Sequence, residues 1–107
     1  MFEATWNALQ ANLTPGTVIP NGTAYHGAFG EPFTVAAVGA TIVVVDPPGA
    51  QTEQRVGIAD FRAVYDHWNN YCHGPMLRRA FRPLTRYSKY VISILHWLEG
   101  HLGGQLP

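Results

Sequence analysis

The sequence predicts an α+β fold with an N-terminal helix, a three-stranded antiparallel meander and two C-terminal helices packed on the sheet. Two observations predict this fold. Apolar residues recur at helical spacing near both ends of the chain, whereas residues 32–58 form short β-branched runs separated by glycine and proline. A length of 107 residues allows one hydrophobic core, so we expect a single domain over residues 1–107.

The N-terminal helix is predicted over the first 13 residues, where large apolar side chains share one helical face. They are Phe2, Trp6, Leu9 and Leu13. The sequence Thr14-Pro15-Gly16 ends this helix, because proline cannot continue the hydrogen-bond ladder and glycine accepts a positive φ. Residues 17–31 are expected to form a glycine-rich loop, in which Val18-Ile19 could add a short edge strand.

Two strands are predicted at residues 32–38 and 41–46, and a third at residues 53–58. A two-residue turn at Gly39-Ala40 would place Val38 opposite Thr41. One face of the hairpin would then carry a set of apolar residues, namely Phe33, Val35, Ala37, Ile42 and Val44. The other face, which includes Val43 and Val45, is also largely apolar, so both faces are expected to need cover.

The central helix is predicted to begin at Asp60, which we expect to be its N-cap, and to end at His73-Gly74-Pro75. One or two helical turns are expected within residues 76–82. The last helix is predicted to begin with Ser88 as its N-cap and to end at Gly103-Gly104. This helix is apolar almost all round, which is typical of a helix that is central to a core or part of a subunit interface.

The composition favours self-association. Only 13% of residues are charged, against an average of about 25%, and the formal net charge is zero. We therefore expect a homo-oligomer, most simply a dimer, formed through the second sheet face or through Tyr90, Ile92 and Trp97 of the last helix. No secretory signal and no apolar run of about 20 residues is visible, so the sequence predicts a cytoplasmic protein without a membrane partner.

Cations are concentrated in one segment. All seven Lys and Arg residues lie between positions 55 and 89, and five fall within twelve residues: Arg78, Arg79, Arg82, Arg86 and Lys89. Because this segment leads into a helix N-terminus, it predicts a site for phosphate or for another polyanion such as a nucleic acid, with Tyr87 and Tyr90 available to stack on a base. The alternative is a solvated connection whose arginines pair with Glu31, Asp46, Glu53 or Asp66.

A small-molecule pocket is a further hypothesis, because aromatic residues could line a cavity between the sheet and the helices. The pocket candidates are Tyr25, His26, Phe29, Trp68 and Tyr71. The alternative is that such residues belong to the core.

Catalysis and metal binding find little support in the sequence. The five histidines lack the spacing of a metal site, and no nucleophile motif or Gly-rich phosphate loop occurs, so we expect no metal, no cofactor and, on balance, no enzyme. A small enzyme would instead need a concave pocket where a histidine meets a carboxylate. The favoured function is a self-associating binding module; a nucleic-acid accessory domain, and a small enzyme or small-molecule binder, remain alternatives.

Four stretches carry a resemblance to a known group of proteins: Phe33-Thr34-Val35, Ile42-Val43-Val44, Ile58-Ala59-Asp60-Phe61 and residues 88–95. Together they resemble a bacterial family of small orphan domains of unknown function, found as hypothetical proteins of integron gene cassettes and other mobile genetic elements. Related domains are also attached to DNA-processing proteins. The resemblance implies a compact α+β domain in a nucleic-acid context and assigns no catalytic residue.

Overall fold

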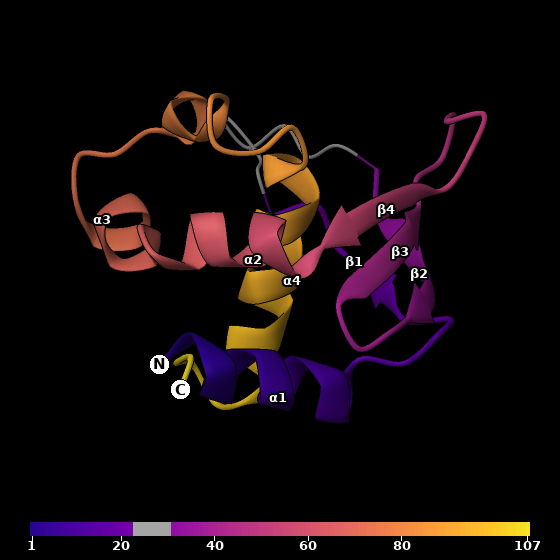
Figure 1. Ribbon diagram of the computed structural model, residues 1–107, viewed down its shortest axis with the longest axis horizontal. Helices are drawn as coiled ribbons and strands as arrows, with labels where there is room; N and C mark the ends of the chain where they lie inside the picture. Colours follow the sequence, from indigo (N-terminus) through magenta and orange to yellow (C-terminus); the bar gives the residue numbers. More distant parts are fainter. Residues whose placement is uncertain (23–30) are drawn as a thin grey trace.

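The computed structural model describes residues 1–22 and 31–107 and has an α+β fold (Figure 1). Its elements follow in chain order: α1 (Phe2–Asn12), β1 (Val18–Ile19), β2 (Phe33–Val38), β3 (Ile42–Asp46), β4 (Gln54–Gly57), α2 (Ile58–Tyr65), α3 (Trp68–His73), the 3₁₀ helix η1 (Arg78–Phe81) and α4 (Ser88–His101). The predicted fold class is confirmed, whereas the predicted numbers of strands and C-terminal helices differ from those observed.

The sheet has four antiparallel strands in the order β1-β2-β3-β4. The predicted number of three strands is one too few, because Val18 and Ile19 pair with Thr34 and Phe33 at the edge of the meander. The short edge strand considered at these two residues is thereby confirmed. Hydrogen bonds that join Gly16 and Thr17 to Val35 continue this pairing. The short strand β1 therefore ties the chain after α1 to the sheet.

The β2–β3 hairpin turns one residue later than predicted. Val38 lies opposite Val43 rather than Thr41, and the N–H of Gly39 donates to the carbonyl of Ile42, so Ala40 and Thr41 form the turn. A bulge between Val35 and Ala37 then changes the register by one residue, so that Val35 lies opposite Val45.

The faces predicted for the hairpin were consequently wrong. The core face combines Phe33 and Val35 of β2 with Val43 and Val45 of β3, whereas Val44 lies outside the core cluster. The later turn alone shifts the pairing by two residues, which leaves the faces unchanged. The bulge adds one residue to β2, so Val35 lies opposite Val45 rather than Val44, and this single-residue change of register exchanges the faces of β3.

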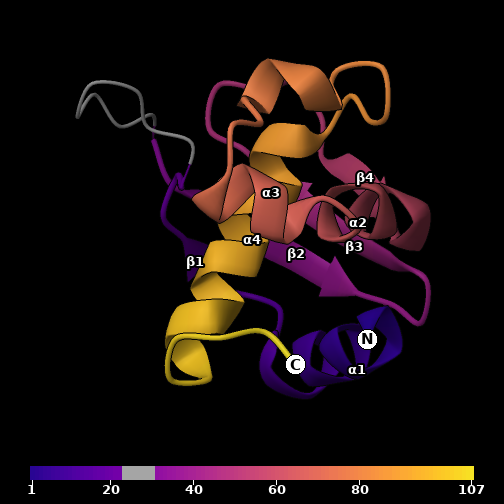
Figure 2. The same cartoon turned by 90° about the vertical axis from the view of Figure 1, so that its left-hand side faces the viewer.

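One hydrophobic core joins the inner face of the sheet to the helices. Figures 1 and 2 show α2 and α4 on this face, with α1 across the end of the hairpin, and neither view shows a helix on the opposite face. The indole N–H of Trp6 donates to the carbonyl of Ala40 at 3.1 Å, so α1 also holds the hairpin turn. No helix in the described parts of the chain has the length and apolar character needed to cross a bilayer.

The predicted central helix is two helices, α2 and α3. His67 has a non-helical φ of −116°, and its N–H donates to the carbonyl of Val64, which tightens the last turn of α2. The pair Asn69-Asn70, with low helix propensity, follows directly. At the end of α3, a Cβ on Gly74 would lie 2.8 Å from the carbonyl oxygen of Asn70, so glycine is required there.

Asp60 is not the N-cap of α2. The helix begins two residues earlier, and the Asp60 carboxylate reaches back from the third helical position to accept from the N–H of Gly57 at 3.0 Å. Ser88 is likewise the first residue of α4, and its N-cap is Tyr87. Asp60 and Ser88 both lie in the first turn of their helices, but neither occupies the N-cap position.

Helix α4 is central to the fold of a single chain. Val91, Ile92, Ile94, Leu95 and Leu98 are all 0–1% exposed. Since Ile92 is fully buried by its own chain, it cannot form part of the dimer interface expected on this helix. Its neighbours Tyr90 and Trp97 are also partly buried against the core.

Candidate functional site

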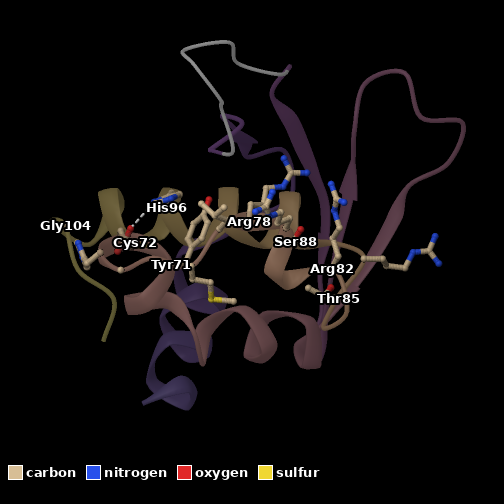
Figure 3. Close-up of a pocket in the computed structure, with 15 residues that line it drawn as sticks. Tyr71, Cys72, Arg78, Arg82, Thr85, Ser88, His96 and Gly104 are labelled. Carbon is tan, nitrogen blue, oxygen red and sulfur yellow. Dashed lines mark hydrogen bonds and ion pairs between the residues drawn. The ribbon is translucent and has the colours of Figure 1, made fainter.

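A groove of about 1340 Å³ lies between α3, the segment that contains η1, and α4. It extends from Gly104 at one end, past His96 and Tyr71, to Ser88, Arg82 and Thr85 at the other end (Figure 3). The groove is lined by residues from positions 71 to 104, so the C-terminal third of the chain builds it.

Four of the five predicted anion-binding cations line this groove: Arg78, Arg79, Arg82 and Arg86. All four are exposed. Two ion pairs occur in the described parts of the chain, one between Arg62 and Glu3 and one between His96 and Glu99. None of the groove arginines is therefore paired with a carboxylate there, and the pairings considered from the sequence are not observed.

The arginines project from a segment that is anchored by two buried side chains. Phe81 is 0% exposed and packs its ring edge-on against Tyr71, with the ring centroids 5.4 Å apart. The hydroxyl of Thr85 donates to the Asp60 carboxylate at 2.7 Å and accepts from the N–H of Tyr87 at 3.0 Å. Phe81 and Thr85 thus fix the backbone from which Arg82 projects.

The N-terminus of α4 opens onto the same groove. Ser88 is only 8% exposed, yet its hydroxyl has no hydrogen-bond partner in the described structure, and the residue lines the groove. The first N–H groups of a helix have no partner within that helix and carry its positive dipole end. A hydroxyl at such a position is available to donate to an anion held beside Arg82 and Arg86.

Apolar side chains lie next to the arginines. Tyr71, Met76 and Leu77 line the groove, and Leu77 is 55% exposed. Desolvation by burial, together with the adjacent Cys72, raises the pKa of Tyr71, while the positive charge of Arg78 opposes that rise. Figure 3 shows Tyr71 and Arg78 in the same part of the groove. The groove therefore offers both an aromatic ring and a guanidinium.

A histidine and a carboxylate meet further along the groove. His96 Nδ1 lies 3.1 Å from one oxygen of Glu99, and the indole N–H of Trp68 donates to the other oxygen at 3.0 Å. The arrangement ties α3 to α4 and orients the imidazole. It is also the feature expected of a small enzyme, so that alternative stays open.

The single cysteine is unsuited to be the nucleophile of such an enzyme. Burial and, to a smaller extent, the nearby Glu99 carboxylate raise the pKa of the Cys72 thiol from 9.0 to about 11. The reactive thiolate is therefore a minor species at neutral pH. No group of three or more potential metal ligands occurs in residues 1–22 and 31–107.

The remaining predicted anion-binding residues do not line the arginine groove. Lys89 lines a smaller cavity of about 120 Å³ beside Glu31, and its ammonium group lies 5.7 Å from the ring centroid of Tyr90. Tyr87 is partly buried, with the guanidinium of Arg86 5.3 Å from its ring centroid. The tyrosine that lines the groove together with the arginines is therefore Tyr71, which the sequence suggested for a separate pocket.

Of the pocket candidates, only Tyr71 is placed at the groove. Trp68 is 8% exposed and belongs to the core, whereas Tyr25, His26 and Phe29 lie outside the described residues. Sequence reasoning missed the contribution of Thr85. The sequence does show a small hydroxyl residue between arginines at this position. Its hydrogen-bond partner Asp60, however, lies 25 residues away and cannot be found from residue spacing.

Comparisons with protein-family models, curated proteins and solved structures found no match. The resemblance to the small bacterial orphan domains therefore stays a prediction. Any functional interpretation has to come from the groove itself.

Proposed function

We propose that the groove binds the phosphate backbone of a nucleic acid. The observation that carries this proposal is the convergence of Arg78, Arg79, Arg82 and Arg86 on one groove without a carboxylate partner in the described structure. An unpaired guanidinium keeps all its donors available and matches the geometry of two phosphate oxygens.

The anchoring of the arginine segment supports this function. Phe81 and Thr85 are buried, and Thr85 is hydrogen-bonded to Asp60 on α2. The backbone beneath the arginines is therefore ordered before any ligand arrives, which lowers the entropic cost of binding. The free hydroxyl of Ser88 and the N-terminus of α4 add donors at the same place.

The zero net charge is compatible with such binding because the charges are segregated. Between Asp66 and Glu99, the chain carries five cations and no acidic residue. A local basic surface attracts phosphate within a Debye length, which is about 8 Å at physiological ionic strength. We therefore expect moderate affinity that falls steeply with added salt.

Fluorescence anisotropy of labelled oligonucleotides at low and moderate salt tests this proposal. The double variant Arg79→Ala/Arg82→Ala should weaken binding at least about tenfold and reduce the salt slope by about 2. The matched control is Arg55→Ala/Arg62→Ala, which removes the same charge from exposed positions outside the groove. Equal losses in both variants, or no binding even at low salt, would overturn the proposal.

Self-association is our second candidate function, and the outer face of the sheet favours it. Val18 is 58% exposed on this face, and the partly exposed Ile42 shares it by the alternation of β3, whereas Val44 is only 8% exposed. Light scattering should then give the mass of a dimer, and Ile42→Lys should convert it to a monomer, whereas Leu102→Lys on the exposed end of α4 should not. A monomeric wild-type protein at high concentration would contradict this candidate.

The cytoplasmic location and the integron-cassette or mobile-element context remain part of the proposal. In both settings, nucleic acids are the abundant polyanions that the chain would meet. The small enzyme or small-molecule binder is retained as the third alternative on the contact between His96 and Glu99.

A further inference from the structure

We infer that the strand bound in the groove is single-stranded, with a base stacked on Tyr71 while its phosphates lie on the arginines. This inference rests on the proposed function and names the class of nucleic acid that the groove recognises. It goes beyond backbone binding because it assigns a role to the apolar wall of the groove, which phosphate contacts alone leave unused.

The groove combines apolar and cationic surface. Tyr71, Met76 and Leu77 line the same groove as the arginines, and Leu77 leaves 55% of its surface exposed immediately before Arg78. A duplex turns its charged phosphates outward and keeps the faces of its bases stacked inside. An unpaired strand offers planar apolar surface together with phosphate, which is the combination used by single-strand binding sites.

The Tyr71 ring is held in place by two other aromatic rings. Phe81 packs edge-on against it at 5.4 Å, and Trp68 lies at 5.9 Å in a tilted arrangement. Two buried aromatic residues therefore support a ring that is itself only partly buried. A supported ring loses little conformational freedom when a base stacks on it, so the contact favours binding at small entropic cost.

Arg78 lies near the Tyr71 ring in the groove. Arg78 is close enough to Tyr71 for its positive charge to influence the phenol. Its planar guanidinium can contact the phosphate that follows the stacked base or stack on the next base. Along the groove, Tyr71 is followed by Arg78 and then by Ser88 and Arg82, so cationic and hydroxyl side chains lie on one side of the ring, where the strand would continue (Figure 3).

The experiment measures binding of the full chain to three labelled ligands of equal length: a single strand, the same strand in a duplex, and an abasic strand that has phosphates and sugars without bases. We expect the single strand to bind tightest. Tyr71→Ala should weaken its binding about 5- to 150-fold and leave binding of the abasic strand unchanged. Tyr71→Phe keeps the ring and should retain the affinity for the single strand.

A second variant guards against a folding defect in Tyr71→Ala. Leu77→Ser alters an exposed side chain of the same wall and should also weaken binding of the single strand without affecting the abasic strand. If the duplex binds as tightly as the single strand, or if Tyr71→Ala weakens the abasic strand equally, the inference is wrong while backbone binding stands. If no strand binds, including the abasic one, the proposed function fails and the inference with it.

Discussion

The middle of α4 and the arginine segment at residues 78–86 are neighbours in the chain but are held in opposite ways. Helix α4 buries five consecutive residues, from Val91 to Leu95, between the sheet and the other helices. The arginine segment buries only Phe81 and Thr85, and its charged side chains are exposed. The difference teaches that the residues that stabilise this fold and the residues that carry its exposed positive charge are not the same residues.

This separation has an energetic basis. Full burial of a large apolar side chain stabilises a fold by about 1.5–3 kcal/mol, so α4 contributes much of the stability through contacts that need no precise polar partner. The arginine segment depends on one aromatic ring and on the hydrogen bonds of Thr85. A change in α4 should therefore affect the whole domain, whereas most changes in the arginine segment should affect the groove alone.

The largest effect is expected from Leu95→Ala. Leu95 is 1% exposed and lies in the core, so its truncation should lower the free energy of unfolding by about 2–5 kcal/mol through lost burial and a residual cavity. Urea denaturation followed by circular dichroism measures this change. The control Leu102→Ala, at a position that is 38% exposed, should cost less than about 0.5 kcal/mol. Similar losses at both positions would mean that α4 is not central to the core.

Sequence reasoning succeeded where one element determines its own pattern. The apolar face of α1 and the apolar run of α4 were readable because helical spacing directly reports which side chains are buried. The register of the β2–β3 hairpin was not readable, because a bulge between Val35 and Ala37 changes the pairing by one residue and places Val45 rather than Val44 opposite Val35. A bulge is set by packing across the sheet, which the linear pattern does not encode.

The candidate site shows the same division. The cluster of arginines was visible in the sequence, since composition alone reveals it. That Tyr71 joins these arginines was not visible, because its contact with Phe81 is a tertiary contact that residue spacing does not reveal. The sequence also could not show that Lys89 lies outside the arginine groove, where it lines a smaller cavity near the start of α4.

An intermediate effect is expected from Thr85→Val, which keeps the shape of the side chain but removes its hydroxyl. The Asp60 oxygen and the N–H of Tyr87 would both lose a partner, so unfolding free energy should fall by about 1–3 kcal/mol. Thermal denaturation measures the loss. Thr85→Ser should restore most of it, and Thr52→Val, at an exposed position, serves as the matched control. An unchanged melting temperature in Thr85→Val would show that the hydroxyl does not anchor the segment.

The smallest effect on stability is expected from Arg79→Ala/Arg82→Ala. Both arginines are exposed and have no ion pair in the described structure, so the free energy of unfolding should change by less than about 0.5 kcal/mol. Because neighbouring like charges repel, any change at low salt should be a gain in stability.

The same pair of proteins distinguishes a binding segment from a structural one. Added polyphosphate should raise the melting temperature of the wild type, because a ligand that binds only the folded state stabilises it, and should leave that of the double variant nearly unchanged. A loss of more than about 1 kcal/mol in the variant without ligand would mean that Arg79 and Arg82 hold the fold together. In that case, the contrast with α4 would disappear, since both regions would then contribute to stability. If the variant is as stable as the wild type but no longer responds to polyphosphate, the unpaired arginines of the groove serve ligand binding and not the stability of the fold.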